Sequence, residues 1–344
     1  MLLRMLDAHP QLAVANDTHF IPRVLERARP AAIAESTAGL DIPLGVDLAE
    51  SIWNYHRFSR LGITRDEFDV CYSRSSTYAE FVSQLYATFA KMRGKTWALE
   101  KTPDYVRHIP LLHALFPGSQ IIHIIRDGRD VGLSLRDWAH KKKGPGRLAL
   151  WDENPLATCA IWWDWLVTTG CRDGAALPPS RYFELTYESL LVNPEAQLVA
   201  LCKFLQLPYD ESMTNYHQGK QRHAAGLSAK QAWLPPTQGL RSWRDQLNMD
   251  EIELFEDLAG TTLAHCGYEV DRRPPSPANR SIAIECRRWW EAYLQQREEK
   301  FQSSIRRSSG GVNSATPVMI PQVSRQSEVT ERGSLVPAPV RSDH

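Results

Sequence analysis

The chain of 344 residues is long enough for one large or two modest domains, and its 43% of apolar residues suffices for a hydrophobic core. Its 40 basic and 40 acidic residues cancel to a formal net charge of zero, so the overall charge favours neither nucleic acid nor an anionic membrane as a partner. The sequence has no apolar run of the ~18 residues that a membrane span needs, and it begins without the basic and apolar regions of an export signal. We therefore expect a soluble, cytoplasmic protein.

The six cysteines are scattered along the chain and form no C-x-x-C pair. In a chain of this length, such cysteines are typical of reduced thiols in the core, and they predict neither a disulfide framework nor a zinc site. Since no other spacing of metal ligands is evident, the sequence predicts no metal.

Hydrophobic periodicity and turn residues predict alternating helices and strands in the first part of the chain. A short helix over 1–7 ends near Pro10, and an extended segment over 11–20 follows. Residues 26–77 alternate short helical pieces with proline and glycine. Thr77 is expected to cap an amphipathic helix, after which the stretch TWALEKTP forms a strand.

The same reasoning predicts these elements in the rest of the chain: a helix near 105–115, a strand in SQIIHIIRDGRD, a helix over about 130–140, an apolar helix in PLATCAIWWDWLVTTG, and a strand, turn and helix in RYFELTYESLLVNPEAQLVALCKFLQL. Residues 279–306 suit an amphipathic helix with Trp289 and Trp290 on its apolar side. The composition from about Ser308 onward predicts a disordered tail.

Strands that are nearly all apolar and separated by helices predict an α/β fold, a three-layer parallel sheet with helices on both faces. Functional loops lie at the carboxyl ends of such strands. Lys101, Arg126 and Tyr187 each directly follow a predicted strand. We therefore expect these three side chains on the same rim of the sheet.

The stretch IIRDGRDVGLSL is the most informative one. A strand ends, Arg126 follows, Gly128 is expected to permit a tight turn, and Ser134 lies two turns into the next helix. A guanidinium and a hydroxyl near the start of a helix can bind a phosphate, because the amides there point at it too. Alternatively, Arg126, Asp127, Arg129 and Asp130 simply pair with each other as a salt-bridge cluster.

Other charged residues have two interpretations each. Lys101 is either a solvated charge or, beside a phosphate site, a group that neutralises a leaving group. Asp17 and His19 are either turn residues or general bases. The stretch HKKKGPGR, over 140–147, is either an exposed loop or an electropositive lip for an anionic ligand.

Together these stretches resemble the sulfotransferases that use 3′-phosphoadenosine-5′-phosphosulfate (PAPS), which have a P-loop NTPase-like fold. The branch with protein-tyrosine sulfotransferases and their bacterial relatives is the most similar. The resemblance covers about residues 1–265 and rests on four stretches: LLRMLDAHPQLAVANDTHFIPRVL, IIHIIRDGRDVGLSL, FELTYESLLVNPE and GLRSWRDQL. The first two are specific in combination, and the last two are weak singly.

The resemblance implies roles for individual residues. Arg126 and Ser134 would hold the 3′-phosphate of PAPS, and Tyr187 would lie at the nucleotide. Lys101 would face the sulfuryl group. Asp17 would stand where the tyrosine-modifying branch has a glutamate that acts as the base.

The resemblance also implies a segment that closes over the nucleotide. Ser228 and the segment from Leu240 to Arg244 would approach the cofactor. The lysine of the family motif is absent there, and Arg241 or Arg244 would take its place.

The resemblance implies a segment before the first helix as well. In the family a strand and a loop similar to Arg-Ser-Gly-Thr-Thr come before LLRMLDAHP, and the backbone amides of that loop hold the 5′-phosphosulfate. Because Met1 stands where the loop would end, we expect the first strand to be missing, with roughly 15–20 residues absent. Either the start codon is set too late, or the protein has lost its anion cradle.

These observations predict a sulfotransferase that moves a sulfuryl group from PAPS to a hydroxyl or amine of an unknown protein, sugar or lipid acceptor. Two alternatives stay open: a P-loop-type kinase, whose Gly-x-x-x-x-Gly-Lys-Ser/Thr loop does not appear in the chain, and a non-catalytic nucleotide-binding remnant. We expect an α/β domain over 1–270, a helical extension over 271–306 and a disordered tail over 307–344.

Overall fold

The structure is a computed structural model that describes residues 1–34, 40–140, 154–218, 242–271 and 273–308. Residues Met1–Ser309 form one compact unit. Among the described residues, none of the helices combines the length and the hydrophobicity needed to span a bilayer.

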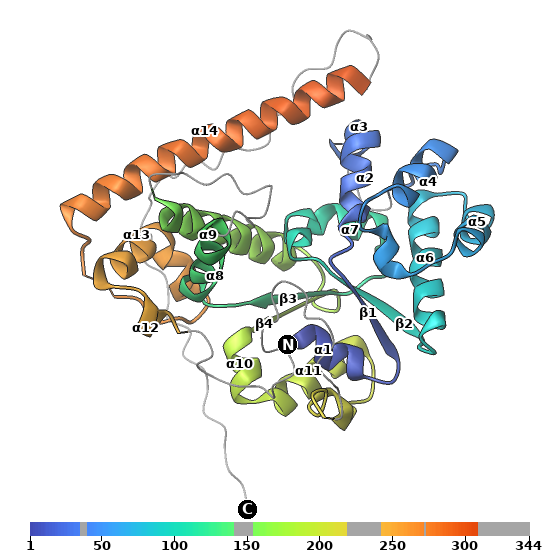
Figure 1. The fold of residues 1–344 in the computed structure, drawn as a ribbon, viewed down its shortest axis with the longest axis horizontal. Coiled ribbons are helices and arrows are strands. Elements are labelled where there is room, and N and C mark those ends of the chain that lie inside the picture. Colours follow the sequence, from blue (N-terminus) through green and yellow to red (C-terminus); the bar gives the residue numbers. More distant parts are fainter. Residues whose placement is uncertain (35–39, 141–153, 219–241, 272, 309–344) are drawn as a thin grey trace, which may run out of the picture. The chain divides into compact units, whose positions relative to one another are not determined.

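The first half of this unit alternates strands with many short helices (Figure 1). Its elements are α1 (Leu2–Ala8), β1 (Leu12–Asn16), α2 (Phe20–Ala28), α3 (Pro30–Ala34), α4 (Val46–Trp53), the 3₁₀ turn η1 (Phe58–Leu61), α5 (Arg65–Ser73), α6 (Tyr78–Met92), β2 (Trp97–Lys101), the 3₁₀ turn η2 (Pro103–His108), α7 (Ile109–Leu115) and β3 (Ile121–Ile125).

Longer helices make up most of the second half. The elements are α8 (Gly128–His140), α9 (Pro155–Ala175), β4 (Tyr182–Thr186), α10 (Tyr187–Val192), α11 (Pro194–Leu205), the 3₁₀ turn η3 (Glu211–Met213), α12 (Trp243–Gln246), α13 (Met249–His265) and α14 (Pro277–Ser308).

The four strands form two parallel pairs, β1 with β2 and β3 with β4. One face of both pairs is buried in the same hydrophobic cluster, which contains Leu12, Val14, Ile122 and Leu185 together with helices α1 and α11. The strands therefore share a helical layer on this face, although the two pairs do not hydrogen-bond to each other within the described chain.

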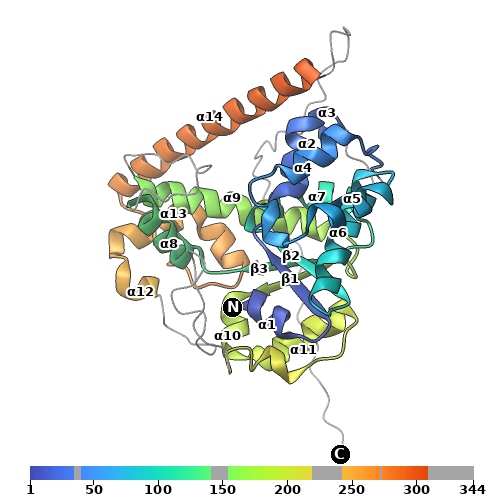
Figure 2. The ribbon, with the colours of Figure 1, turned by 45° about the vertical axis from the view of Figure 1, so that its right-hand side comes forward.

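Different helices cover the opposite face of each pair. Ala13 and Ala15 of β1 pack into a core with α2 and α4–α7, and Ile125 of β3 packs into a core with α8, α9, α13 and α14. Figure 2 shows α9 and α13 on one side of β3, and α1, α10 and α11 on the other. The predicted α/β fold with parallel strands and helices on both faces is confirmed.

Local sequence signals explain where several helices begin. The Thr77 side chain accepts a hydrogen bond from the Glu80 backbone at the start of α6, while Glu80 bonds back to the Thr77 backbone. This reciprocal pair satisfies two amides that a helix start otherwise leaves unbonded. The predicted cap at Thr77 is confirmed, and Asn154 caps α9 in a similar way.

Two segments differ from the sequence prediction. The extended stretch predicted over 11–20 ends at Asn16, because Asp17 and His19 adopt left-handed backbone angles, with φ of 55° and 61°, and α2 begins at Phe20. Helix α14 begins and ends two residues outside the predicted 279–306 and has the expected apolar side. Its first half buries Ala283 and Trp290 against α9 and α13.

Candidate functional site

Asp17 and Lys101 meet at the carboxyl ends of β1 and β2. The register pairs Asn16 with Lys101, and the Asp17 amide continues the ladder by donating to the Lys101 carbonyl oxygen at 2.8 Å. The Lys101 ammonium lies 3.1 Å from Asp17 Oδ1 and 3.4 Å from Asn16 Oδ1. Since both charged side chains are partly exposed, this ion pair is accessible to a ligand.

Two arginines that the sequence analysis did not single out hold the loop after β1. Arg60 donates to the carbonyl oxygens of Asn16 and Asp17 at 3.1 and 3.0 Å, and Arg57 donates to the Asp17 carbonyl at 3.3 Å. Arg60 also lies 3.9 Å from the Asp17 carboxylate. A left-handed conformation is costly for a residue other than glycine, and these hydrogen bonds offset that cost.

Behind this loop lies the buried carboxyl group of Glu100. It accepts hydrogen bonds from the Thr18 amide at 3.2 Å and from the Thr102 hydroxyl. Burial raises the pKa of Glu100 above its ordinary value. Thr18 also shares a 3.0 Å hydrogen bond with Tyr86, so the Asp17 loop is fixed from both sides. His19 lies at the start of α2, next to this loop.

Arg126 emerges at the carboxyl end of β3, as predicted. One of its terminal nitrogens lies 2.8 Å from Asp130, and its guanidinium lies 4.9 Å from the centre of the Tyr187 ring, at the end of β4. The Trp163 indole donates to the Arg126 carbonyl at 3.1 Å. Within the described residues, the Nε of Arg126 is buried without a hydrogen-bond partner, which leaves a donor available for an anion.

The second arginine of the same turn has a different environment. Arg129 is 1% exposed, makes two hydrogen bonds to Asp127 at 3.0 and 2.8 Å, and lies 2.5 Å from Glu256. The salt-bridge cluster considered as the alternative is present, since Arg129 pairs with Asp127 and Arg126 pairs with Asp130. Arg129 gains further partners from outside this cluster, the Glu256 carboxylate and the Glu269 carbonyl, whereas Arg126 has only one acidic partner among the described residues.

Gly128 does not have the role that the sequence suggested. Gly128 does not have a positive φ, so the turn does not depend on a left-handed glycine. A Cβ atom at this position would lie only 2.5 Å from the Trp163 ring. Glycine is required here because Trp163 packs directly on the start of α8.

The segment that was predicted to close over the nucleotide docks on this turn through Trp243. Its amide donates to Asp130 at 2.9 Å, its indole donates to Asp127 at 3.0 Å, and its ring lies 3.7 Å from the guanidinium of Arg129. The predicted Arg241 and Ser228 lie outside the described residues, as do 141–147 of the predicted basic lip.

Ser134 lies on α8, one turn beyond Asp130 and two turns beyond Arg126. Residues four apart share one face of a helix. Ser134 and the Asp130 partner of Arg126 therefore face the same side of α8.

The first turn of α1 lies between the two groups of residues. The charges of Lys101 and Arg4 both act on the backbone nitrogen of Met1, while Tyr216 lies within electrostatic reach of both Arg4 and Tyr187. Figures 1 and 2 both show α1 between β1 and α10, the helix that begins at Tyr187. Helix α1 thus begins between the ends of the two strand pairs, and the amides of a helix start favour an anion.

Comparisons with known proteins show the family of the chain. A sequence profile of the sulfotransferase family matches residues 1–211. The chain is 22% identical over 281 residues to protein-tyrosine sulfotransferase A of Caenorhabditis elegans, and 23% identical over 284 residues to protein-tyrosine sulfotransferase 1 of Homo sapiens. Each alignment covers 80% of this chain, and it covers 66% and 68% of the two relatives, so the chain spans about two thirds of their length.

Two solved structures are also similar. The sulfotransferase domain of the curacin biosynthetic pathway is 20% identical, with a TM-score of 0.45 over 83% of this chain and 91% of that domain. The sulfotransferase domain of the Synechococcus PCC 7002 olefin synthase is 17% identical, with a TM-score of 0.47 over 76% of this chain and 95% of that domain. Because the family profile matches more than half of the chain, the protein belongs to the sulfotransferase family.

Proposed function

We propose that the protein transfers a sulfuryl group from PAPS to a hydroxyl or amine acceptor at the carboxyl ends of its strands. The observation that carries this proposal is the presence of two features, one at the carboxyl end of each strand pair. One is the accessible Asp17–Lys101 ion pair, and the other is Arg126 with an unpartnered buried Nε. Membership of the sulfotransferase family supports the reaction class.

The residues around Arg126 fit the 3′-phosphate of this donor. A phosphate oxygen could accept from Nε, and charge-assisted hydrogen bonds of this kind contribute about 1.5–3 kcal/mol each. Ser134 offers a hydroxyl on the same face of α8. Tyr187, packed on Arg126, would border the nucleotide. These contacts are far from the reacting sulfur and would serve to fix the donor.

Asp17 and Lys101 would act at the reacting atoms. A bound PAPS supplies the sulfuryl group, which forms a bond to the acceptor oxygen or nitrogen as its bond to the phosphate oxygen breaks. Asp17 would accept the acceptor proton, and the Lys101 ammonium would donate to the phosphate oxygen that gains charge. Because the two side chains are paired at 3.1 Å, this division of roles requires Lys101 to turn from Asp17 toward the donor.

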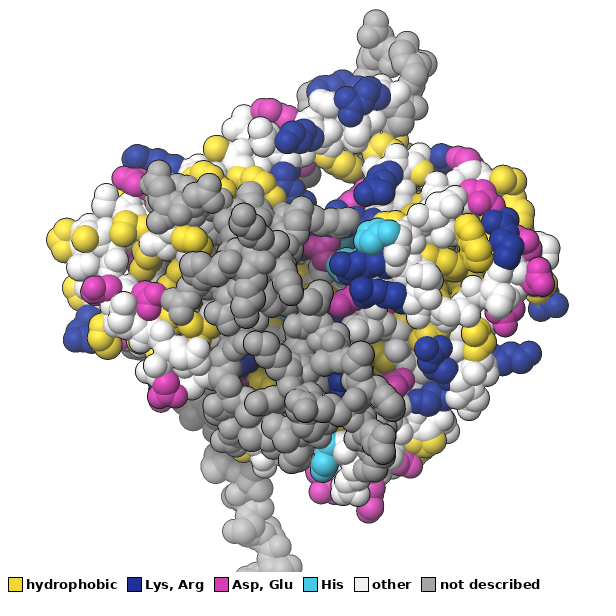
Figure 3. All heavy atoms as spheres, in the orientation of Figure 1, with side chains coloured by type: hydrophobic (Ala, Val, Ile, Leu, Met, Phe, Trp, Pro, Cys, Tyr) yellow, Lys and Arg dark blue, Asp and Glu magenta, His cyan; other side chains and the backbone are white. Residues whose placement is uncertain are grey.

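The relatives named above suggest which acceptor to examine first. They are named for protein tyrosine, so we propose a tyrosine hydroxyl in a polypeptide as the acceptor. On the described residues of the face drawn in Figure 3, basic and acidic side chains lie side by side. Together with the zero net charge, this distribution does not favour a polyanion as the acceptor.

The test is a transfer assay with radiolabelled PAPS and separate tyrosine-containing peptides, sugars and lipids. We expect labelled peptide, and we expect Asp17→Asn to lower the rate by about 10²–10⁴-fold, as for loss of a general base. Asp66→Asn, which replaces an exposed acid on α5, is the matched control and should keep the wild-type rate. No labelled product with any acceptor, together with no binding of adenosine 3′,5′-bisphosphate, would contradict the proposal. Binding without transfer would instead indicate a non-catalytic nucleotide-binding protein.

A further inference from the structure

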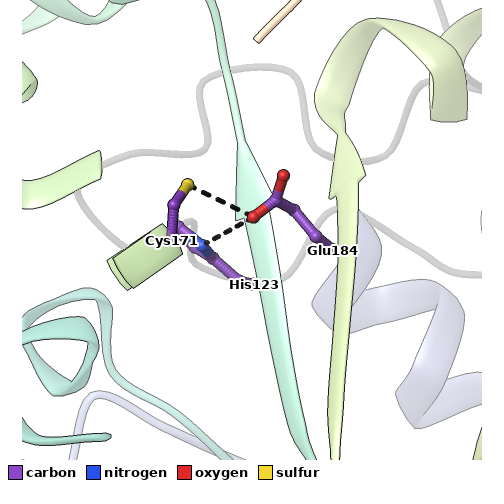
Figure 4. A group of neighbouring side chains, drawn as sticks. All are labelled: His123, Cys171 and Glu184. Carbon is purple, nitrogen blue, oxygen red and sulfur yellow. Dashed lines mark hydrogen bonds and ion pairs between the residues drawn. The ribbon is translucent and has the colours of Figure 1, made fainter. Parts of the chain in front are cut away.

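A second group of reactive side chains lies on the face of β3 and β4 that α9 covers. His123 and Glu184 are register partners on these parallel strands, so their side chains extend from the same face of the sheet. Cys171 of α9 lies opposite them. Figure 4 shows the three side chains pointing toward one another. Their possible ligand atoms all lie within 4.8 Å of each other.

Glycines allow α9 to come close to this face. A Cβ atom at Gly170 would lie 2.7 Å from the His123 ring, and a Cβ atom at Gly174 would lie 2.2 Å from the Tyr182 ring. Both glycines sit on α9 on either side of Cys171. Larger residues would push the helix away, so these glycines let the Cys171 thiol reach the strand residues.

Hydrogen bonds already connect the side chains of this group. The Cys171 thiol donates to Glu184 Oε2 at 3.2 Å, and the Tyr182 hydroxyl donates to the same oxygen at 2.7 Å. His123 Nδ1 lies 2.7 Å from the Tyr182 hydroxyl and 3.7 Å from Glu184. The Cys171–Glu184 hydrogen bond places a proton between two atoms that are also good metal ligands.

A second cysteine lies beside this group, outside the set of atoms that are all within 4.8 Å of one another. Cys266, which follows the last residue of α13, is in hydrogen-bonding contact with the Cys171 thiol. These two cysteines are partly exposed, whereas the other four in the chain are buried. An imidazole, a carboxylate and one thiol therefore meet from β3, β4 and α9, and the Cys266 thiol, which contacts Cys171, would have to turn toward them to become a fourth ligand.

We propose that His123, Cys171, Glu184 and Cys266 bind one zinc ion that links β3 and β4 to α9 and α13. Two thiolates, an imidazole and a carboxylate suit zinc, whereas calcium and magnesium prefer all-oxygen sites. Zinc bonds of about 2.0–2.3 Å place the ligands of a tetrahedral site roughly 3.3–3.8 Å apart. The Cys171 Sγ–Glu184 Oε2 distance of 3.2 Å and the His123 Nδ1–Glu184 Oε2 distance of 3.7 Å lie close to this range.

The metal would take the place of the protons that now connect the ligand atoms. Cys171 and Cys266 would bind as thiolates, and His123 Nδ1 would bind without a proton, so zinc binding releases protons. Tyr182 would keep its hydrogen bond to Glu184 and orient that carboxylate. This ion would have a structural role, and it is separate from the Asp17 and Arg126 residues proposed for sulfuryl transfer.

The test uses the full chain, freed of metal with a chelator and kept reduced with a phosphine. Zinc is added and the bound metal is counted, and cobalt is used in parallel because cobalt–thiolate bonds absorb in the near ultraviolet. We expect about one zinc per chain, the cobalt–thiolate absorption, and a Tm that rises by several degrees with zinc, since a ligand that binds only the folded state stabilises it.

Variants keep the proposal falsifiable. Cys171→Ser and Cys266→Ser should each lose the cobalt–thiolate band or weaken it, and zinc should no longer raise their Tm. Cys71→Ser is the matched control, because serine can keep the 3.3 Å hydrogen bond to Thr88, and it should bind zinc as the wild type does. If a cysteine variant fails to fold, Glu184→Gln at the exposed edge should still weaken zinc binding by about tenfold or more.

The opposite results are equally clear. Three results would each overturn the proposal. The first is zinc binding below one equivalent, and the second is zinc binding that Cys171→Ser and Glu184→Gln leave unchanged. The third is a Cys171–Cys266 disulfide that persists under reducing conditions with zinc present. None of these readouts depends on sulfuryl transfer, so the two proposals fail independently.

Discussion

The two arginines of the turn after β3 should respond in opposite ways to the same substitution. Arg129→Met removes a charge that is 1% exposed and leaves the carboxylates of Asp127 and Glu256, which are 8% and 6% exposed, without their partner. Breaking a buried ion pair by removing one member costs about 3–5 kcal/mol. For a unit of this size, such a loss lowers Tm by about 5–8 °C.

Arg126→Met removes a charge that is only partly buried and has one ion-pair partner, Asp130. An ion pair of this kind is worth about 1 kcal/mol or less, so Tm should change by no more than about 3 °C. If Arg126 holds the 3′-phosphate, however, the variant loses at least one charge-assisted hydrogen bond of about 1.5–3 kcal/mol. Its affinity for adenosine 3′,5′-bisphosphate should fall by roughly 10–150-fold.

Differential scanning calorimetry and isothermal titration calorimetry measure the two effects on the same samples. Arg129→Met should melt early, and Arg126→Met should melt normally but bind the nucleotide weakly. The reasoning is refuted if Arg126→Met binds like the wild type, or if the two variants lose equal stability.

Two further predictions concern packing and pH. Gly128→Ala should lower stability by about 1–3 kcal/mol, because its Cβ atom would lie 2.5 Å from the Trp163 ring. Gly118→Ala is the control and should have little effect on Tm, because a Cβ atom there would have nothing within 4 Å. Equal melting of the two variants would contradict this prediction. Burial lowers the pKa of His108 from 6.5 to about 4, although Glu26 lies 3.6 Å away. Between these two pH values the unfolded chain therefore binds more protons than the folded chain. The free energy of unfolding should fall by up to about 3 kcal/mol as the pH drops from about 6.5 to 4. Thermal melts across this range should show a slope that His108→Gln reduces, and an unchanged slope would show that other groups are responsible.

The strand that carries Arg126 could be predicted because its signal is local. A continuous apolar run ends at Ile125, and a charged turn follows directly. The carboxyl end of such a strand is where ligands bind in parallel sheets, so the position of Arg126 followed from pattern alone. The same reasoning placed Lys101 and Tyr187 correctly at strand ends.

The contacts that decide what each residue does could not be predicted in this way. Arg57 and Arg60 reach the loop after β1 from a region without strong periodicity, and Trp243 reaches the turn after β3 from more than a hundred residues away. Arg129 is buried and Arg126 is partly exposed because Glu256 and Trp243 contact Arg129. Only tertiary packing determines that.

The cysteines illustrate the same limit. Scattered thiols predicted reduced core residues, which fits Cys71 and Cys202. Cys171 and Cys266 lie far apart in the sequence and come together only because α9 packs on α13. No ligand spacing could reveal that group. The cytoplasmic location stays a prediction.

The central claim is that the strand ends around α1 bind the sulfate donor. The most direct measurement is hydrogen–deuterium exchange with and without adenosine 3′,5′-bisphosphate, with AMP as the control that lacks the 3′-phosphate. The account predicts slower exchange in residues 126–134 and around Lys101 and Tyr187, with much weaker protection at 126–134 from AMP. Unchanged exchange at these strand ends, with protection confined to another part of the chain, would contradict it.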